Sequence, residues 1–254
     1  GDSAVRKQVL ARSLSENELA WHYGNARRVP TQTVFFQDRR SESLLVTKTA
    51  MSSPDRHKTI LVDGVGTVEW TALGPEPLQT GVSLRLQLCR HAYFQEWERF
   101  YALFESFLRW SMKKWVSQGG LDGRALDALF VNACQKEDGH FALFDLEWRA
   151  LGTINSSWFV FRNVFNLVRE QEWISSSAPF LSFADLYEKS CLVLGLVPDL
   201  EADLKKEASL QAQTGLGSFE HHAAQLEGLF RRPLPRAIGP RDPAQESRLR
   251  HPDP

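Results

Sequence analysis

The 254-residue chain has little cysteine and no hydrophobic run long enough to cross a bilayer. Its three cysteines, Cys89, Cys134 and Cys191, are far apart and have apolar neighbours. This pattern argues against a disulfide framework or a cysteine-based zinc site and favours a reducing compartment. The N-terminus also lacks the charged-then-apolar pattern of a signal peptide. These absences predict a cytoplasmic protein with no transmembrane segment, in which the cysteines are small core residues.

Neither positive nor negative charge is in excess in this chain. The 30 basic and 31 acidic residues give a net charge of -1, and neither half of the chain is strongly basic or acidic. The overall charge therefore predicts no nucleic-acid partner and no attraction to a membrane surface. With 43% hydrophobic residues, the chain can bury a substantial core. Its length suits one large domain or one domain built of two lobes.

The first third of the chain has the pattern of β structure. Alternating residues predict a hairpin of strands at 33–37 and 43–49, and a second pair at 59–62 and 67–71. The second pair flanks a turn with two glycines, which we interpret as structural. Ahead of these strands, residues 4–23 have a helical pattern that could continue from an upstream segment, so we expect the chain to be part of a longer protein.

The period changes after Ser83, where apolar residues begin to recur every three or four positions. This pattern predicts a long buried helix, broken near Arg90 and ended by the glycines of Gln118–Gly120. Three more helices are expected, at 157–170, 182–196 and 199–213. Beyond Phe230, proline and arginine dominate, which predicts a disordered tail.

Three polar residues stand at a distinctive spacing after the long helical segment. Asn132 follows Asp127 by five positions, and Asp145 follows thirteen positions later, on segments expected to be short strands around a turn at 136–139. Phosphoryl transfer needs a carboxylate to orient or deprotonate the acceptor hydroxyl. It also needs an amide and a second carboxylate to hold magnesium on the nucleotide phosphates. The spacing predicts such a site, and the alternative is three turn-forming residues without chemistry.

Two motifs carry a resemblance to a known superfamily. The segment Leu121–Asn132 resembles the catalytic loop of the protein-kinase-like superfamily, and Phe144-Asp-Leu-Glu-Trp148 resembles its metal-binding segment. The chain is closer to the aminoglycoside and choline kinase branch, in which an acidic residue often stands two positions after the metal-binding aspartate, as Glu147 does here. The run from Trp21 to Trp148 is similar to a kinase-like domain found behind a methyltransferase or glycosyltransferase in bacterial surface-polysaccharide proteins. The resemblance covers roughly residues 15–215.

The resemblance implies an α+β, two-lobed kinase-like fold. Residues 1–82 would form a small β-rich N-lobe with an N-terminal helix, residues 83–229 a mainly helical C-lobe, and residues 230–254 the disordered tail. The segment 76–83 would be the hinge between the lobes, whose backbone commonly receives adenine.

The resemblance also implies a role for each site residue. Asp127 would be the catalytic base, Asn132 and Asp145 the metal ligands, and Lys48 the lysine that pairs with the nucleotide phosphates, so the cofactors would be ATP and Mg²⁺. The acceptor would be a hydroxyl of a small molecule or glycan, with a sugar terminus in bacterial surface-polysaccharide biosynthesis as one candidate. An upstream domain of the same polypeptide is the expected partner.

Several positions depart from the family pattern. Ala125 stands where active kinases usually have histidine, Leu129 where many have a basic or hydroxyl residue, and Glu147 where many have glycine. No glycine-rich loop precedes Lys48, and no acidic residue clearly matches the helix glutamate that would pair with it. The alternative hypothesis is therefore a catalytically silent kinase-like scaffold or substrate-binding module of an S-adenosylmethionine-dependent methyltransferase or a glycosyltransferase.

Two further features of the C-terminal half have both a structural and a functional interpretation. The functional interpretation places Arg162 and Arg169 against an anionic acceptor, whereas the structural one needs only the favourable position of cations near a helix C-terminus. His221 and His222 have no metal-ligand partners at suitable spacing and predict a solvated helix surface.

Overall fold

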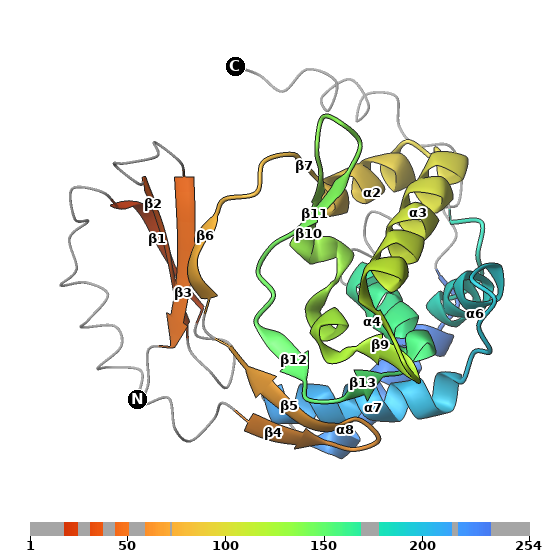
Figure 1. Cartoon of the computed structure of the whole chain (residues 1–254). Helices are drawn as coiled ribbons and strands as arrows, with labels where there is room; N and C mark the ends of the chain where they lie inside the picture. The colour runs from red at the N-terminus through yellow and green to blue at the C-terminus, as the bar shows by residue number, and fades with distance from the viewer. Residues whose placement is uncertain are drawn as a thin grey trace.

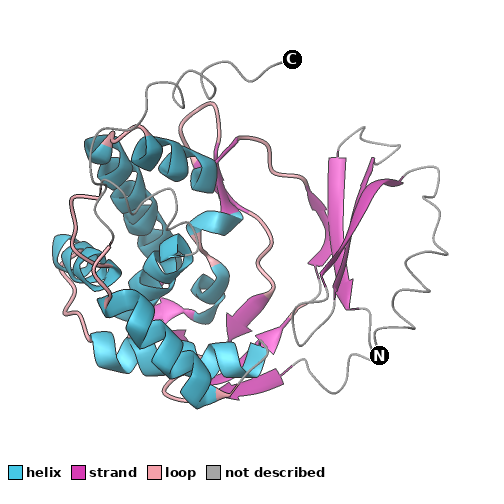
Figure 2. Cartoon of the chain, turned by 180° about the vertical axis from the view of Figure 1, so that it is seen from behind, coloured by secondary structure: helices cyan, strands magenta, loops and turns pink. Residues whose placement is uncertain are grey.

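The computed structural model describes residues 18–24, 31–37, 44–50, 59–71, 73–168, 178–214 and 218–234. Within these ranges the chain is a mixed α/β protein with six α-helices and four small antiparallel sheets. Figure 1 shows the helices packed together in one body, with a four-stranded sheet to one side of it. Seen from behind, the helical body and the four-stranded sheet are joined by extended segments (Figure 2).

The four-stranded sheet has the order β1-β2-β3-β6, and neighbouring strands are antiparallel. Its strands are β1 Glu18–Gly24, β2 Thr31–Gln37, β3 Leu44–Ala50 and β6 Leu73–Pro77. The predicted hairpin is confirmed as β2 and β3. The helix expected at 4–23 is wrong over residues 18–23, which form β1, and its earlier part lies outside the described residues. Backbone pairing with β2, a contact outside the local pattern, decides this segment.

The second predicted hairpin is also confirmed, but it belongs to another sheet. Strand β4, Thr59–Val62, pairs with β5, Gly66–Trp70, and β5 pairs with β12, Trp148–Ala150, from the middle of the chain. Gly64 and Gly66 both have positive φ in the turn. The hairpin therefore packs beside the segment that carries Asp145.

The long helical pattern after Ser83 becomes two helices. They are α2, Leu84–Tyr93, and α3, Trp97–Trp115, separated where Gln95 has a φ of 59°. The predicted break is confirmed and lies a few residues after Arg90. The predicted stop is wrong in mechanism: α3 ends at Trp115, and the two glycines instead shape a hairpin of β8, Val116–Ser117, and β9, Gly120–Asp122.

The three polar residues lie outside strands, contrary to the sequence-based expectation. Asp127 ends the 3₁₀ helix η2, Gly123–Asp127, and Asn132 ends the 3₁₀ helix η3, Phe130–Asn132. Asp145 lies in an irregular segment between two strands. The remaining short strands are β7 Val82–Ser83, β10 Ala133–Gln135, β11 Phe141–Leu143 and β13 Thr153–Ile154. Local hydrogen bonds favour turns here. The Asp127 carbonyl accepts from the Leu129 N–H and from the Asn132 side-chain N–H, and the Asp145 carbonyl accepts from the Glu147 N–H.

The last helices are α4 Ser156–Val168, α6 Phe183–Val193, α7 Leu200–Thr214 and α8 Phe219–Arg231. Helices α4, α6 and α7 confirm the three helices that the sequence predicted at 157–170, 182–196 and 199–213. The expected start of a disordered tail at residue 230 is wrong, because Phe230 is fully buried and stacks on Phe161 with ring centroids 4.3 Å apart. The Leu234 N–H also donates to the Leu181 carbonyl at 2.9 Å. Residues 235–254 lie outside the described part.

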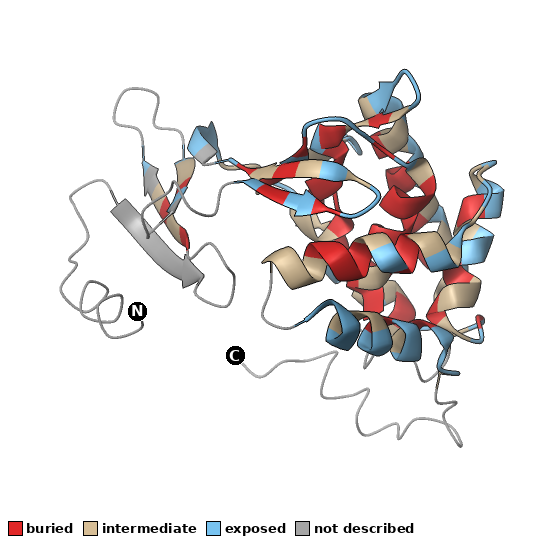
Figure 3. Cartoon of the chain, turned by 90° about the horizontal axis from the view of Figure 1, so that it is seen from below, coloured by how far each residue is buried: buried red, intermediate tan, exposed pale blue. Residues whose placement is uncertain are grey.

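The core lies mainly in the helical body. Figure 3 shows buried residues concentrated along the packed helices, and α4 is buried on nearly every side. The aromatic side chains of α4 at Trp158, Phe159 and Phe161 are fully buried and form part of this core. Cys134 and Cys191 are buried as expected, Cys89 is half-buried, and these three cysteines, all within the described ranges, form no disulfide. Among the described residues, no helix is both long enough and apolar enough to cross a membrane.

Candidate functional site

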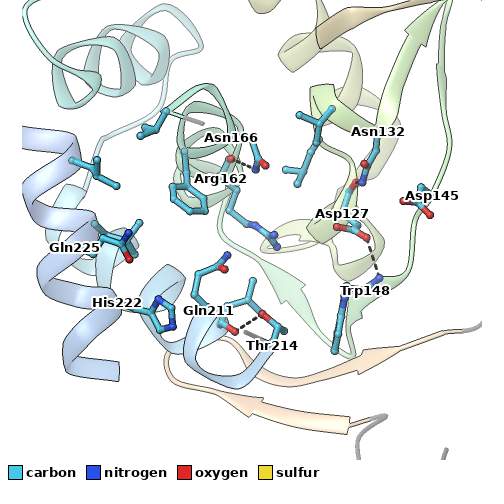
Figure 4. A pocket seen from close by; sticks show the side chains of 17 residues that line it. Asp127, Asn132, Asp145, Trp148, Arg162, Asn166, Gln211, Thr214, His222 and Gln225 are labelled. Carbon is cyan, nitrogen blue, oxygen red and sulfur yellow. Dashed lines mark hydrogen bonds between the residues drawn. The ribbon is translucent and has the colours of Figure 1, made fainter. Parts of the chain in front are cut away.

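Asp127, Asn132 and Asp145 line one cavity of about 620 Å³. Figure 4 shows them on one wall, with side chains of α4, α7 and α8 on the opposite side. The alternative interpretation of the spacing, three turn-forming residues without chemistry, gives no reason for these side chains to share one location. The fold instead gathers them, because β10 and β11 form a hairpin that returns the chain to the end of η3.

Asp127 is held at the end of η2 by close packing and by backbone donors. Its side chain is buried, and Oδ2 accepts hydrogen bonds from the N–H groups of Glu147 at 2.9 Å and Trp148 at 3.2 Å. At the other end of η2, the Asp122 carboxylate accepts hydrogen bonds at 2.9 Å from the Arg124 guanidinium and from the Arg124 backbone N–H. These bonds lower the pKa of the Asp122 carboxyl. The Asp127 carboxylate is thus tied to the segment that follows Asp145.

Asn132 connects the same two segments. Its side-chain N–H donates to the Asp127 carbonyl at 3.0 Å, and its own carbonyl accepts from the Phe144 N–H at 2.9 Å. Because the amide nitrogen is used in this bond, the side-chain oxygen is the atom that Asn132 could offer to a cation. Between the two residues, the Phe130 N–H donates to Oδ1 of the buried Asn163 on α4 at 3.0 Å.

Asp145 has a backbone φ of 61°, in the left-handed region that aspartate tolerates better than most residues. Its Oδ1 accepts a hydrogen bond from Lys48 Nζ at 2.7 Å. Lys48 lies in β3, opposite Thr33 of β2, and only 8% of it is exposed. The structure therefore brings the predicted phosphate-binding lysine to the predicted metal ligand, although 97 residues separate them.

Glu147 is the site residue that sequence reasoning missed. It is 1% exposed, forms an ion pair with Lys48, and accepts a hydrogen bond at Oε2 from Trp70 Nε1 at 3.1 Å. The acidic partner of Lys48 therefore comes from the segment after Asp145 and not from a helix. A carboxylate between apolar neighbours in the sequence was the available signal, since such a group needs a cation when buried.

The donor set fits magnesium only with help from a nucleotide. Among the described residues, no three His, Cys, Asp or Glu side chains converge at metal-binding spacing. Mg²⁺ commonly uses one or two protein oxygens and completes its octahedron with phosphate oxygens and water. The Asn132 amide oxygen and the Asp145 carboxylate are of that kind, and both border the cavity.

The far side of the cavity combines apolar side chains with polar ones that are mostly neutral. Its polar side chains are Arg162 and Asn166 of α4, Gln211 and Thr214 of α7, and His222 and Gln225 of α8. The prediction of a solvated helix surface describes the exposed His221, but it is wrong for His222, whose Nε2 is buried at this cavity. Helix α8 turns one histidine inward because residues one apart point in different directions.

Comparison of the chain with protein-family models, with curated proteins and with solved structures finds no match in any of the three.

Proposed function

We propose that this chain is a kinase-like phosphotransferase domain that transfers a phosphoryl group from ATP to a hydroxyl. The observation that carries the proposal is the 2.7 Å contact between Lys48 on β3 and Asp145 after β11. A cation on a small sheet and an aspartate on a loop of the helical body are the two groups that grip nucleotide phosphates and metal in such enzymes. Asp145 also lines the cavity that holds Asp127 and Asn132, which supports a single site.

Each residue then has a defined task. Asn132 and Asp145 would hold magnesium, and Lys48 would bind phosphate oxygens. With ATP bound, the magnesium ion would supply the positive charge that offsets charge building up on the transferred group. Asp127 would orient the acceptor hydroxyl and accept its proton as the oxygen attacks.

The ion pair of Lys48 with Glu147 compensates for one departure from the family pattern, the lack of a helix glutamate that would pair with the lysine. Active kinases hold the phosphate-binding lysine with a glutamate. Here the buried Glu147 provides that carboxylate, and Trp70 fixes its orientation. The lysine is thus oriented without a glutamate on a separate helix.

The arrangement of the sheet and the helical body supports a two-lobed fold. The segment after β6 connects the two parts, and it lies against β10, where the Cys134 thiol contacts the Thr80 carbonyl at 3.7 Å. A Cβ on Gly81 would lie 2.5 Å from the Gln135 carbonyl oxygen, so only glycine allows this approach. Backbone groups of this segment would receive the adenine. We also propose, from the resemblance alone, a cytoplasmic role beside an upstream domain in assembling a bacterial surface polysaccharide, with a sugar terminus as acceptor.

A second candidate is a silent kinase-like module that serves as scaffold or substrate-binding part of a methyltransferase or glycosyltransferase. Three observations favour it. Ala125 and Leu129 are buried apolar residues at positions where active kinases usually carry functional side chains. In addition, Asp127 already accepts two backbone hydrogen bonds on one oxygen.

Thermal unfolding with ATP tests the site directly. With magnesium and ATP at about 100 times Kd, stabilisation should be near 2.7 kcal/mol. Omitting magnesium, or the change Asp145→Asn, should remove it. Asparagine tolerates the positive φ of residue 145, so the fold should persist. Asp138→Asn, an exposed aspartate in the β10–β11 turn, is the matched control and should keep the full shift.

The variant Asp127→Asn separates the two candidates. It should keep the magnesium-dependent shift and lose about 100-fold or more of the ADP release that an active enzyme shows, because general-base catalysis contributes at least that much. A shift without turnover in the natural protein would favour the silent module. Absence of any nucleotide shift in the natural protein would contradict both the proposed activity and the proposed metal ligands.

A further inference from the structure

A buried arginine projects into the cavity from the most apolar helix of the protein. Arg162 lies on α4 among fully buried residues such as Phe161 and Val164, and only 7% of it is exposed. Figure 4 shows its side chain directed into the cavity, with the guanidinium between Asp127 and Gln211 in this view. Burial of a guanidinium is costly unless its donors are paired, so this placement needs a reason.

The protein pairs Arg162 incompletely. Glu207 Oε2 lies 3.4 Å from Arg162 Nε, an ion pair without hydrogen-bond geometry. The other oxygen of Glu207 accepts from Gln211 Nε2 at 2.7 Å. Both Nε and Nη1 of Arg162 are buried and lack a hydrogen-bond partner among the described residues. A guanidinium has five N–H donors in a planar fork, and buried donors are normally satisfied.

The rest of this end of the cavity is built from neutral polar groups and apolar side chains. Asn166, Gln211, Thr214 and Gln225 line it, and His222 adds an Nε2 that is also buried without a partner within the described part of the chain. The charged residues that line the cavity are Asp127 and Asp145 at one end and Arg162 on the other side. A molecule that spans the cavity would therefore meet carboxylates at one end and unsatisfied donors at the other.

We propose that Arg162 binds an oxyanion, a phosphate or carboxylate group, on the acceptor substrate. The planar fork of arginine matches two oxygens of such a group, which would satisfy the buried donors. A purely neutral acceptor would need amides and hydroxyls alone, and it would leave the arginine unexplained. The position of the acceptor hydroxyl at Asp127 rests on the proposed function, but the oxyanion site does not.

Calorimetric titration of nucleotide-free and metal-free protein with inorganic phosphate tests the site. The natural protein should bind phosphate. Glu207→Gln should bind it about tenfold more tightly, because the guanidinium loses its competing carboxylate and charge-assisted hydrogen bonds are strong. The double variant Arg162→Gln with Glu207→Gln removes both charges together, avoids an unpaired buried carboxylate, and should bind about tenfold or more weakly than the natural protein.

Other ligands identify the class of anion and the location of binding. If acetate binds and phosphate does not, the anionic group of the acceptor is a carboxylate. If phosphate alone binds, that group is a phosphate ester. Asp138→Asn, the exposed control in the β10–β11 turn, should leave the phosphate affinity unchanged, since that residue lies outside the cavity. Circular dichroism establishes that each variant is folded, and if the double variant is not, the Glu207→Gln result decides.

Three results would overturn the proposal: no binding of either anion, equal binding by the double variant, or no tightening in Glu207→Gln. Binding of glucose without binding of anions would also overturn it. None of these measurements contains ATP or magnesium, so their failure is distinct from a failure of the nucleotide test described above.

Discussion

Lys48 illustrates how burial changes the chemistry of a single residue. A lysine near the end of a strand is usually solvated, but here the side chain reaches from β3 to two carboxylates, Asp145 and Glu147. Trp70 donates to the second carboxylate from β5. The three elements that meet at this lysine are thus held by one buried charge cluster, which is costly to break from one side.

The variant Glu147→Gln tests this cluster at the residue scale. Removal of one partner from a buried ion pair costs about 3–5 kcal/mol, and because glutamine still accepts a hydrogen bond from Trp70 we expect the lower end of that range. Urea unfolding measures the loss. Glu69→Gln is the matched control, because Glu69 pairs with the half-exposed Arg149 on the same sheet and should cost less than about 1 kcal/mol. Equal effects of the two changes would contradict a special role for Glu147.

At the scale of elements, the position of Asp127 depends on how closely η2 packs against β12 and the turn that follows it. A Cβ on Gly123 would lie 2.0 Å from the Ala150 carbonyl oxygen and 2.5 Å from that of Gly152. Both atoms belong to the backbone and cannot swing aside. The first residue of η2 must therefore be glycine, and this contact sets where the last residue of η2, Asp127, lies.

Gly123→Ala should displace η2 and destabilise the protein by about 1–3 kcal/mol, the usual cost of overpacking. It should also lower the rate of any ADP release, because Asp127 moves with η2. Gly152→Ala is the control: a Cβ there meets nothing within 4 Å, and its effect should be within about 0.5 kcal/mol. Urea unfolding of both variants measures the difference, and a neutral Gly123→Ala would contradict this account of how η2 is positioned.

At the scale of the whole molecule, the helical body buries hydroxyl and thiol groups that ionise at high pH. Burial raises the pKa of Tyr101 from 10.0 to about 12 and that of the Cys191 thiol from 9.0 to about 12. Burial, with the adjacent Asp203 carboxylate, raises the pKa of Tyr187 above its ordinary range. Tyr187 donates to Asp203 at 2.8 Å and accepts from the Asp199 N–H at 2.9 Å, so α6 and α7 share this hydroxyl.

These shifts predict that stability falls as the pH rises. The unfolded chain loses these protons near pH 9–10, whereas the folded chain keeps them up to about pH 12. The unfolded state then binds fewer protons, and the free energy of unfolding decreases with pH by about 1.4 kcal/mol per unit for each proton. Below pH 9 these groups should contribute no slope. Urea unfolding between pH 8 and 12 measures how the free energy of unfolding changes with pH. Tyr187→Phe should make this slope shallower, and an unchanged slope would contradict the assignment.

The sequence by itself determined the features that depend on neighbouring residues. Alternation predicted the β2–β3 and β4–β5 hairpins, helical periodicity predicted α3, α4, α6 and α7, and the spacing of Asp127, Asn132 and Asp145 predicted a shared location. Local patterns carry this information because hydrophobic burial selects a period of about two or 3.6 residues along one segment.

Only the tertiary structure decided which distant residues meet. It made residues 18–24 a strand by pairing them with β2, brought Glu147 and Trp70 to Lys48, and placed Arg162 and His222 at the cavity. Apart from the β1–β2 pairing, these contacts join segments dozens of residues apart, and their free energies depend on burial and on the partner supplied by another element. The sequence therefore predicted most of the elements and three of the polar residues that line the cavity, whereas folding determined the partner of the lysine and the position of Arg162 at the cavity.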